Sequence, residues 1–412
     1  SNLFGTDPKY KYKPLWSVGA AWNIHREAFL QDITWVSVLK LRAAHGFNGN
    51  VAKDALPQVI ASDRLNNLNP IVAIPALELL AHANSGLRWE QTRNLNIGVN
   101  FELFKGISGS IDYYIKKSTD ILATNQIDAS KGGTSALINE ASIRNNGIEL
   151  SLQADWISRR TFNWNTGFVF ANNTSKVLEV YNADINNSSP SWQYISGSYA
   201  NYLKGYSVGA LFNYRYAGLD NTGYPLIYDK DGKVKPLFTN DEKILDVSYA
   251  GSSIPVINIG ISNRVDIGNF YVYCMLNYYG GFKVRVPVPN ASDLRPLEGA
   301  GHYWKQPGDE KDPDILPQIT SSSGKQHYFH LANSDRYTVN GSYLTLGDCT
   351  AAYSFRGRKW VQNAGLSNLE IKLQASNIYT VAFNKYDYSL ATGSYAKPYM
   401  TPVYAAAVNI SF

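Results

Sequence analysis

The sequence lacks the residues and runs that mark disulfide-rich, helical membrane or nucleic-acid-binding proteins. Its two cysteines, Cys274 and Cys349, are too few for a disulfide framework, and no metal-type spacing surrounds them. Each occupies an apolar position of a predicted strand, so we expect each to act as a small hydrophobic side chain. No window holds ~18 consecutive apolar residues, which excludes a transmembrane helix. The basic residues are scattered at a net charge of +5, which argues against a nucleic-acid partner.

Catalytic and metal-binding motifs are also missing. There is no GxSxG, P-loop or CxxC pair. His327 and His330 form an HYFH spacing without a third ligand, so a solvated loop is expected there. Asp229, Asp231 and Gly232 in DKDG resemble the start of a calcium loop, but the later ligands are absent and an ordinary turn is expected. The sequence therefore predicts no enzyme, no metal and no cofactor, with loop calcium left open as a weaker alternative.

Aromatic residues and a period-two alternation are abundant. Aromatics make up 13% of the chain, with 29 tyrosines, a composition that favours strands. In RNLNIGVNFELF, the five residues from Leu95 to Leu103 at every second position are apolar and those between them are polar or glycine, which a helix does not produce. Eleven such strands are predicted, at about 14–24, 34–47, 87–103, 107–118, 144–156, 161–172, 254–266, 269–284, 343–355, 366–378 and 402–412.

The connections between these strands alternate between short and long. The short turns are KG, SRR and IGN, and the long segments lie at about 48–86, 119–143, 173–253, 285–342 and 379–401. Loops this long argue against a compact soluble domain. An outer-membrane barrel has short periplasmic turns at one rim and long extracellular loops at the other. The pattern thus predicts an all-β, transmembrane antiparallel barrel with lipid outside and a wet or plugged lumen; the alternative is a soluble β-sandwich or solenoid.

The last strand places an aromatic residue at the chain end. Tyr404, Ile410 and Phe412 fall on the apolar phase of VYAAAVNISF. With eleven strands and all short turns on one side, Phe412 is expected at the periplasmic rim on the lipid face. We predict that these three residues anchor the closing strand in the membrane interface and assist assembly.

Several collinear stretches resemble the C-terminal half of SusC/RagA-like TonB-dependent transporters of the Bacteroidota outer membrane. They are LRWEQTRNLNIGVNFELFKGISGSIDYYIKKSTDIL (87–122), NNGIELSLQADW (145–156), FNYRYAGLDNTGYPLIYDKDGK (212–233), YWKQPGDEKDPDILPQ, DRYTVNGSYLTLGD, LEIKLQASNIYTVAFNKYD and the final NISF. The resemblance covers nearly all 412 residues. Two departures concern loop specificity: Thr345 stands where the family commonly has arginine, and KYDYSLATG lacks the usual acidic dipeptide.

The resemblance implies a 22-stranded barrel with a plug inside it. Residues 1–412 would be the C-terminal portion, and the plug, the segment that contacts TonB and the first strands would lie upstream of Ser1. We therefore expect a fragment of a longer protein. The resemblance also implies a SusD-like surface lipoprotein that covers the extracellular mouth.

The expected function is TonB-dependent import of an oligosaccharide or oligopeptide, which the sequence does not distinguish. The alternatives are a passive outer-membrane pore and a surface-binding β module. Flat aromatic side chains in the extracellular segments suit sugar rings or extended peptide, although loop aromatics also pack compact loops together. The substrate-binding candidates are Trp192, Tyr194, Tyr206, Tyr303, Trp304, Tyr386 and Tyr388.

Overall fold

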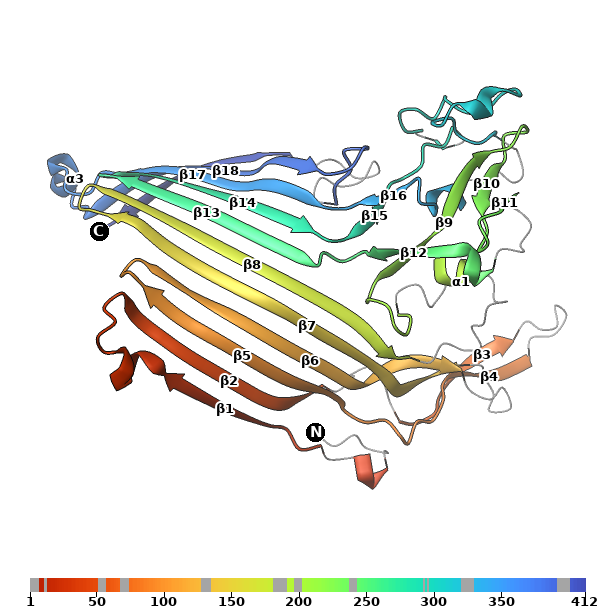
Figure 1. Cartoon of the computed structure of the whole chain (residues 1–412), viewed down its shortest axis with the longest axis horizontal. Coiled ribbons are helices and arrows are strands. Elements are labelled where there is room, and N and C mark those ends of the chain that lie inside the picture. Colours follow the sequence, from red (N-terminus) through yellow and green to blue (C-terminus); the bar gives the residue numbers. More distant parts are fainter. Residues whose placement is uncertain are drawn as a thin grey trace.

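One antiparallel sheet of eleven strands forms most of the molecule, in strict chain order (Figure 1). The computed structural model describes residues 7–10, 13–50, 57–66, 74–126, 135–180, 191–195, 202–236, 243–291, 293–294, 296–319, 330–390 and 401–412. The strands are β1 (Trp16–Asn23), β2 (Val36–Asn50), β5 (Glu90–Leu103), β6 (Ile107–Gln126), β7 (Ser135–Ser158), β8 (Phe162–Glu179), β13 (Ile257–Ile267), β14 (Phe270–Gly280), β17 (Tyr343–Ser354), β18 (Asn368–Ala382) and β19 (Val403–Ser411). All eleven predicted strands are present, which confirms the all-β prediction.

The pairing register keeps the apolar phase of neighbouring strands on one face. Ile97 of β5 lies opposite Tyr113 of β6, which lies opposite Ile148 of β7, and all three side chains are exposed. Asp112 and Glu149 pair with each other one position away, and therefore on the other face. The sheet thus has one apolar face and one polar face, as the alternation predicts. In the part of the chain that the structure describes, no helix is long and apolar enough to cross a membrane.

Short connections gather at one end of the sheet, where the chain also ends (Figure 1). Gly268, with a φ of 62°, makes the tight turn between β13 and β14. A short helix, α3 (Lys359–Asn363), lies in the connection before β18. Beside it, Ser367 donates backbone and hydroxyl hydrogen bonds to the carbonyl oxygens of Ser411 and Phe412. The chain therefore ends at the short-turn rim, as predicted for Phe412. Phe412 is 92% exposed there.

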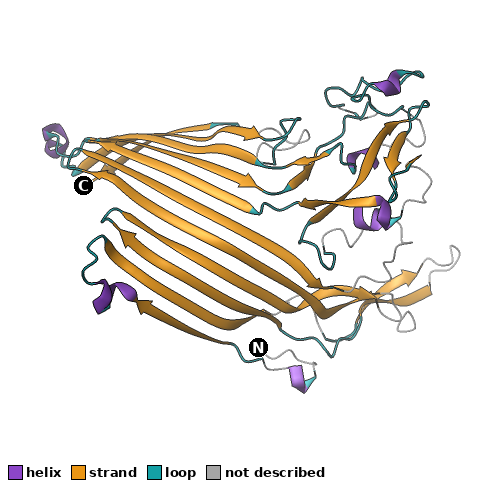
Figure 2. Cartoon of the chain, viewed as in Figure 1, coloured by secondary structure: helices purple, strands orange, loops and turns teal. Residues whose placement is uncertain are grey.

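Longer connections at the other end build small sheets of their own (Figure 2). β3 (Ile60–Asn66) pairs with β4 (Ile74–Ala81), and β15 (Lys283–Arg285) pairs with β16 (Thr338–Asn340). A four-stranded sheet has the order β11 (Val234–Pro236), β10 (Pro225–Tyr228), β9 (Ala210–Leu219), β12 (Val247–Ser252), with α1 (Trp192–Ile195) close to β9.

The prediction of a long loop at 119–143 is wrong in extent. β6 continues to Gln126 and β7 begins at Ser135, so most of this segment is paired strand. The register shifts between Ser118 and Ile121, where Asp120 has a φ of 58°. Such a bulge puts the residues beyond it out of phase, so the period-two pattern stops before the strand does.

Candidate functional site

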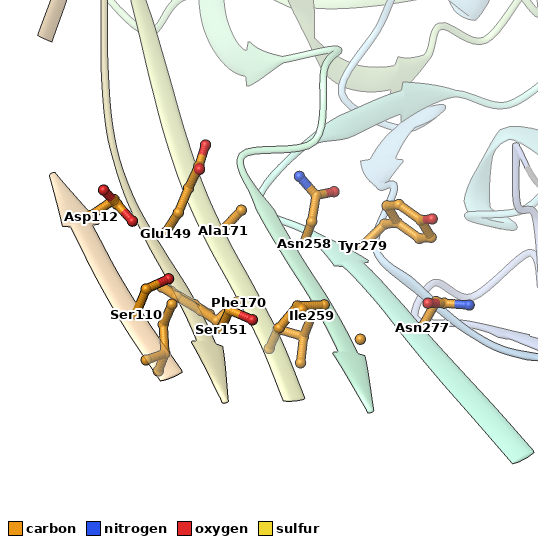
Figure 3. A pocket seen from close by; sticks show the side chains of 13 residues that line it. Ser110, Asp112, Glu149, Ser151, Phe170, Ala171, Asn258, Ile259, Asn277 and Tyr279 are labelled. Carbon is orange, nitrogen blue, oxygen red and sulfur yellow. The ribbon is translucent and has the colours of Figure 1, made fainter. Parts of the chain in front are cut away.

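The polar face of the sheet carries a hollow of about 330 Å³ that spans β6, β7, β8, β13 and β14. Asp112, Glu149, Asn258, Asn277 and Tyr279 supply its carboxylate, amide and phenol groups, and Figure 3 shows them on successive strands. The antiparallel register brings these residues together although they are distant in sequence. Such a wall can bind polar solutes or another polar protein segment by hydrogen bonds.

An ion pair on the polar face joins β2 to β6 across β5, beside this hollow. Arg42 Nη2 lies 2.6 Å from Asp112 Oδ2, and Arg42 Nε donates to Asn100 Oδ1 at 2.8 Å. Gly98 pairs with Arg42 on one side and Asp112 on the other, so the two side chains meet over a position that has no side chain. A Cβ atom there would collide with Asp112 Oδ1. Arg42 therefore neutralises Asp112, while Glu149 is exposed and adds negative charge to the hollow.

A second hollow of about 600 Å³ shares Asn277 and Tyr279 with the first and continues to β17 and β18. The rings of Tyr279 and Tyr343 stack with centroids 4.9 Å apart and planes at 29°. Thr345, the residue that departs from the resembled family, lines this hollow together with Asp348. A flat aromatic surface beside amide, hydroxyl and carboxylate groups offers both stacking and hydrogen bonding to a passing solute.

Two of the predicted loop aromatics pack on the four-stranded sheet. Tyr194 and Tyr206 place their rings 4.9 and 5.0 Å from the ring of Phe212. Phe212 belongs to what we call the β9 cluster, whose buried members are Ile195, Leu203, Ala210, Phe212, Tyr214 and Ile227. These two tyrosines thus hold a loop against β9.

Three more predicted aromatics pack on what we call the β16 cluster. Its buried members are Val286, Leu316, Leu331 and Tyr337, and Tyr303, Tyr386 and Tyr388 lie against it. Tyr337 and Tyr386 stack at 5.6 Å, and the Arg336 guanidinium lies 5.4 Å from the Tyr337 ring. Burial raises the pKa of Tyr337 to about 12. The cluster joins the connections before β17 and β19, and Tyr216 of β9 also packs against it.

The two predicted tryptophans differ in their surroundings. The Trp304 indole packs on Gly223, and its Nε1 donates to Glu310 at 3.1 Å. Trp192 lies on α1 with 53% of its surface exposed. Five of the seven candidates therefore lie in the two clusters, and Trp192 is the one most open to solvent. Contact of any of the seven with substrate stays a prediction.

The DKDG segment forms a turn. Asp229 Oδ1 accepts the backbone N–H groups of Lys233 and Asp231, and these bonds hold the pKa of Asp229 below its usual value. Among the described residues no group of three or more His, Cys, Asp or Glu could hold a metal ion. His327 lies outside the described residues, whereas the His330 ring lies 5.6 Å from that of Tyr214. Loop calcium stays an untested expectation.

The sequence does not identify which polar residues line the two hollows. Asp112 and Glu149 belong to the polar phase of their strands, and that phase is the only signal for them in the sequence. Which polar residues line a hollow depends on the register between five strands, and the sequence does not show it.

Comparison with known proteins agrees with this architecture. The family model described as "TonB dependent receptor-like, beta-barrel" matches residues 2–250. TonB-dependent receptor P26 of Formosa agariphila is 33% identical over 403 residues, covering 92% of this chain and 39% of the relative. The TonB-dependent receptor SusC of Bacteroides thetaiotaomicron is 26% identical over 379 residues, covering 86% and 35%.

Solved structures show the same fold. The RagAB peptide transporter superposes with a TM-score of 0.78 at 21% identity, covering 99% of this chain and 44% of that chain. The RagAB importer in its "open-open" state gives a TM-score of 0.77 at 19% identity. The chain spans about two fifths of the length of the curated relatives it matches. The chain belongs to the TonB-dependent receptor-like β-barrel family of outer-membrane proteins, and within it the chain is similar to SusC.

Proposed function

We propose that this chain supplies barrel wall and extracellular loops to a TonB-dependent importer of a bulky nutrient, an oligosaccharide or an oligopeptide. The observation that carries the proposal is the eleven-stranded wall, with an apolar outer face and a polar lumen face, in a chain of this family. The names of SusC and of the RagAB peptide transporter support a SusC-like importer, and they leave the substrate to experiment.

The lumen face offers a path for such a solute. The Tyr279–Tyr343 stack gives a flat apolar surface for a sugar ring or a peptide side chain. Asn277 and Thr345 beside it offer hydrogen bonds to hydroxyl or amide groups. These contacts bind and orient the solute, and no covalent bond is made or broken. The energy for import reaches the barrel through TonB and a plug outside this chain. We propose no catalytic residue.

We also propose that a SusD-like surface lipoprotein covers the extracellular end. Several large apolar side chains on that end are about half exposed and are available for contact with a partner. They include Trp192, Tyr202, Val234 and Tyr249. Trp192 is our first candidate for contact with the lipoprotein or with the substrate that it encloses, because aromatic side chains dominate such interfaces.

The second candidate function is a passive pore, which the polar lumen face also supports. Uptake in cells with and without a functional TonB distinguishes the two. An importer loses nearly all uptake when TonB is removed, and a pore keeps it.

Purification from native outer membranes tests the proposal directly. The full-length protein is isolated in mild detergent, and co-purifying lipoprotein and bound small molecules are identified by mass spectrometry. We expect a lipoprotein partner and a heterogeneous glycan or peptide ligand. The double variant Tyr279→Ala/Tyr343→Ala should lose bound ligand and uptake, whereas Tyr113→Ala, on the apolar face, should keep both. Ligand-free protein with TonB-independent uptake would contradict import.

A further inference from the structure

The two cysteines of the chain lie opposite each other on neighbouring strands. Cys274 of β14 pairs with Cys349 of β17 in the antiparallel ladder, although the long connection 281–342 separates them in sequence. The flanking pairs, Val272 with Ala351 and Tyr273 with Thr350, keep the same register. Both thiols are free and partly exposed in the structure. We propose that Cys274 and Cys349 form a cross-strand disulfide that joins β14 to β17 in the barrel wall.

The backbone geometry suits this bond. Directly opposite residues in an antiparallel pair have Cα atoms about 4.5 or 5.5 Å apart, depending on the hydrogen-bonding class of the pair. In this ladder Ser354 N–H donates to the Asn269 carbonyl, and the alternation of pairs from there makes Cys274–Cys349 a non-hydrogen-bonded pair. A disulfide requires Cα atoms about 4.4–6.8 Å apart and Cβ atoms about 3.5–4.5 Å apart, and the non-hydrogen-bonded class, with its closer side chains, is the one that approaches both. Opposite residues also project their side chains to the same face of the sheet. No movement of either strand along the ladder is needed.

The surroundings of the pair are apolar. Cys349 lines a shallow hollow on the outer face together with Val272, Leu373 and Tyr404. In a barrel this face meets lipid, where a thiolate is strongly disfavoured. The bond therefore has to form while the strands are still exposed to water, before the barrel is sealed in the membrane. Once formed, it is shielded from water-soluble reductants. This inference uses the membrane location of the family and is independent of the transported solute.

The oxidant is a protein disulfide of a thiol oxidoreductase in the periplasm. The thiolate of one cysteine attacks that disulfide, forming a mixed disulfide and releasing one thiol of the oxidoreductase. The thiolate of the second cysteine then attacks the chain's sulfur in the mixed disulfide and displaces the oxidoreductase as a dithiol. Two electrons pass to the oxidoreductase. The protons lost from the two cysteines balance those gained by its two thiols.

The position of the bond gives it a structural role. The ladder between β14 and β17 is interrupted immediately beyond the pair, where Gly347 forms a bulge between the Met275–Asp348 and Leu276–Leu346 pairs. The long connection 281–342, which contributes Val286, Leu316 and Leu331 to the β16 cluster, starts and ends above this bulge. A covalent link on the short-turn side of the bulge keeps β14 and β17 in register. It thereby holds together the two strands from which the connection 281–342 starts and to which it returns.

Thiol labelling of the full-length protein tests the inference. The protein is isolated from native outer membranes without reductant and denatured in the presence of N-ethylmaleimide. A second sample is reduced before it is labelled in the same way. The number of adducts in each sample is determined by mass spectrometry. We expect no adduct on either cysteine before reduction, two adducts after it, and a cross-linked Cys274–Cys349 peptide in the digest. Two adducts without reduction would overturn the inference.

Register variants supply the matched controls. The single variants Cys274→Ser and Cys349→Ser should each show one reactive thiol without reduction. The variant Cys349→Ser/Thr350→Cys moves the second cysteine by one residue onto the lumen face, and both of its thiols should be labelled without reduction. A disulfide in this shifted variant as well would also overturn the inference, because cross-linking would then not depend on the opposed pair. In folded protein, the native bond should resist a charged reductant until heat unfolds the barrel.

Discussion

At the scale of single residues, Gly98 of β5 leaves room for the ion pair between Arg42 of β2 and Asp112 of β6 on the lumen face. In Gly98→Ala the new Cβ would overlap Asp112 Oδ1 and crowd Arg42 Nε, so the pair has to move. Overpacking of this kind costs about 1–3 kcal/mol. We expect a lower temperature for loss of the folded band in heat-modifiability gels. Gly19→Ala is the control, because its Cβ would meet Ala43 O at an ordinary 3.5 Å. Equal melting of the two variants would refute the crowding.

Tyr337 gives the β16 cluster a defined pH response. Burial raises its pKa from 10.0 to about 12 in the folded protein. The neutral phenol therefore contributes stability that is complete below pH 10 and is lost as the pH rises to about 12, amounting to about 2–3 kcal/mol. We expect the difference in tyrosinate absorbance between wild type and Tyr337→Phe to titrate near pH 12. A transition near pH 10 would show that Tyr337 is open to water.

At the scale of elements, the extracellular sheet has a core separate from the barrel wall. Phe212 of β9 is 3% exposed and contacts Tyr194 and Tyr206. Phe212→Ala should destabilise this sheet by about 3–5 kcal/mol. We expect rapid proteolysis within 202–236 while the barrel keeps its heat-modifiable band. Val234→Ala, at a 53% exposed position of the same sheet, should be cut no faster than wild type. Loss of the barrel band in Phe212→Ala would show that the two parts unfold together.

Element prediction succeeded where each strand is uniform and failed at its irregular ends. β13 and β14 keep one phase throughout, so their hairpin around Gly268 was predicted within a few residues. β6 and β7 shift register near Asp120, and the sequence pattern predicts loop where their outer parts form strand. The packing of Tyr194, Tyr206 and Tyr386 could not be predicted either, because their partners lie on elements that meet only in the folded loops.

At the scale of the whole molecule, the two faces of the sheet meet different solvents. Leu373 of β18 lies on the apolar face and its neighbour Gln374 on the polar face. Leu373→Arg should cost about 2–4 kcal/mol if it lies near the bilayer midplane, because the charge would face lipid. Gln374→Arg should cost much less, because its charge reaches the lumen. The measurement is the fraction of folded barrel recovered from outer membranes. Equal recovery of both variants would contradict this orientation of the sheet.

The sequence by itself determined the eleven strands of the main sheet and, where a strand is regular, the face that each of its residues occupies. These properties are local, because the alternation of side chains along a strand records which face meets lipid. Only the tertiary structure decided which residues meet across strands. Cys274 lies opposite Cys349, and Tyr279 stacks on Tyr343, because register and bulges set these contacts over long sequence separations. A shift of one residue in register would leave the strand pattern of the sequence unchanged and separate both pairs.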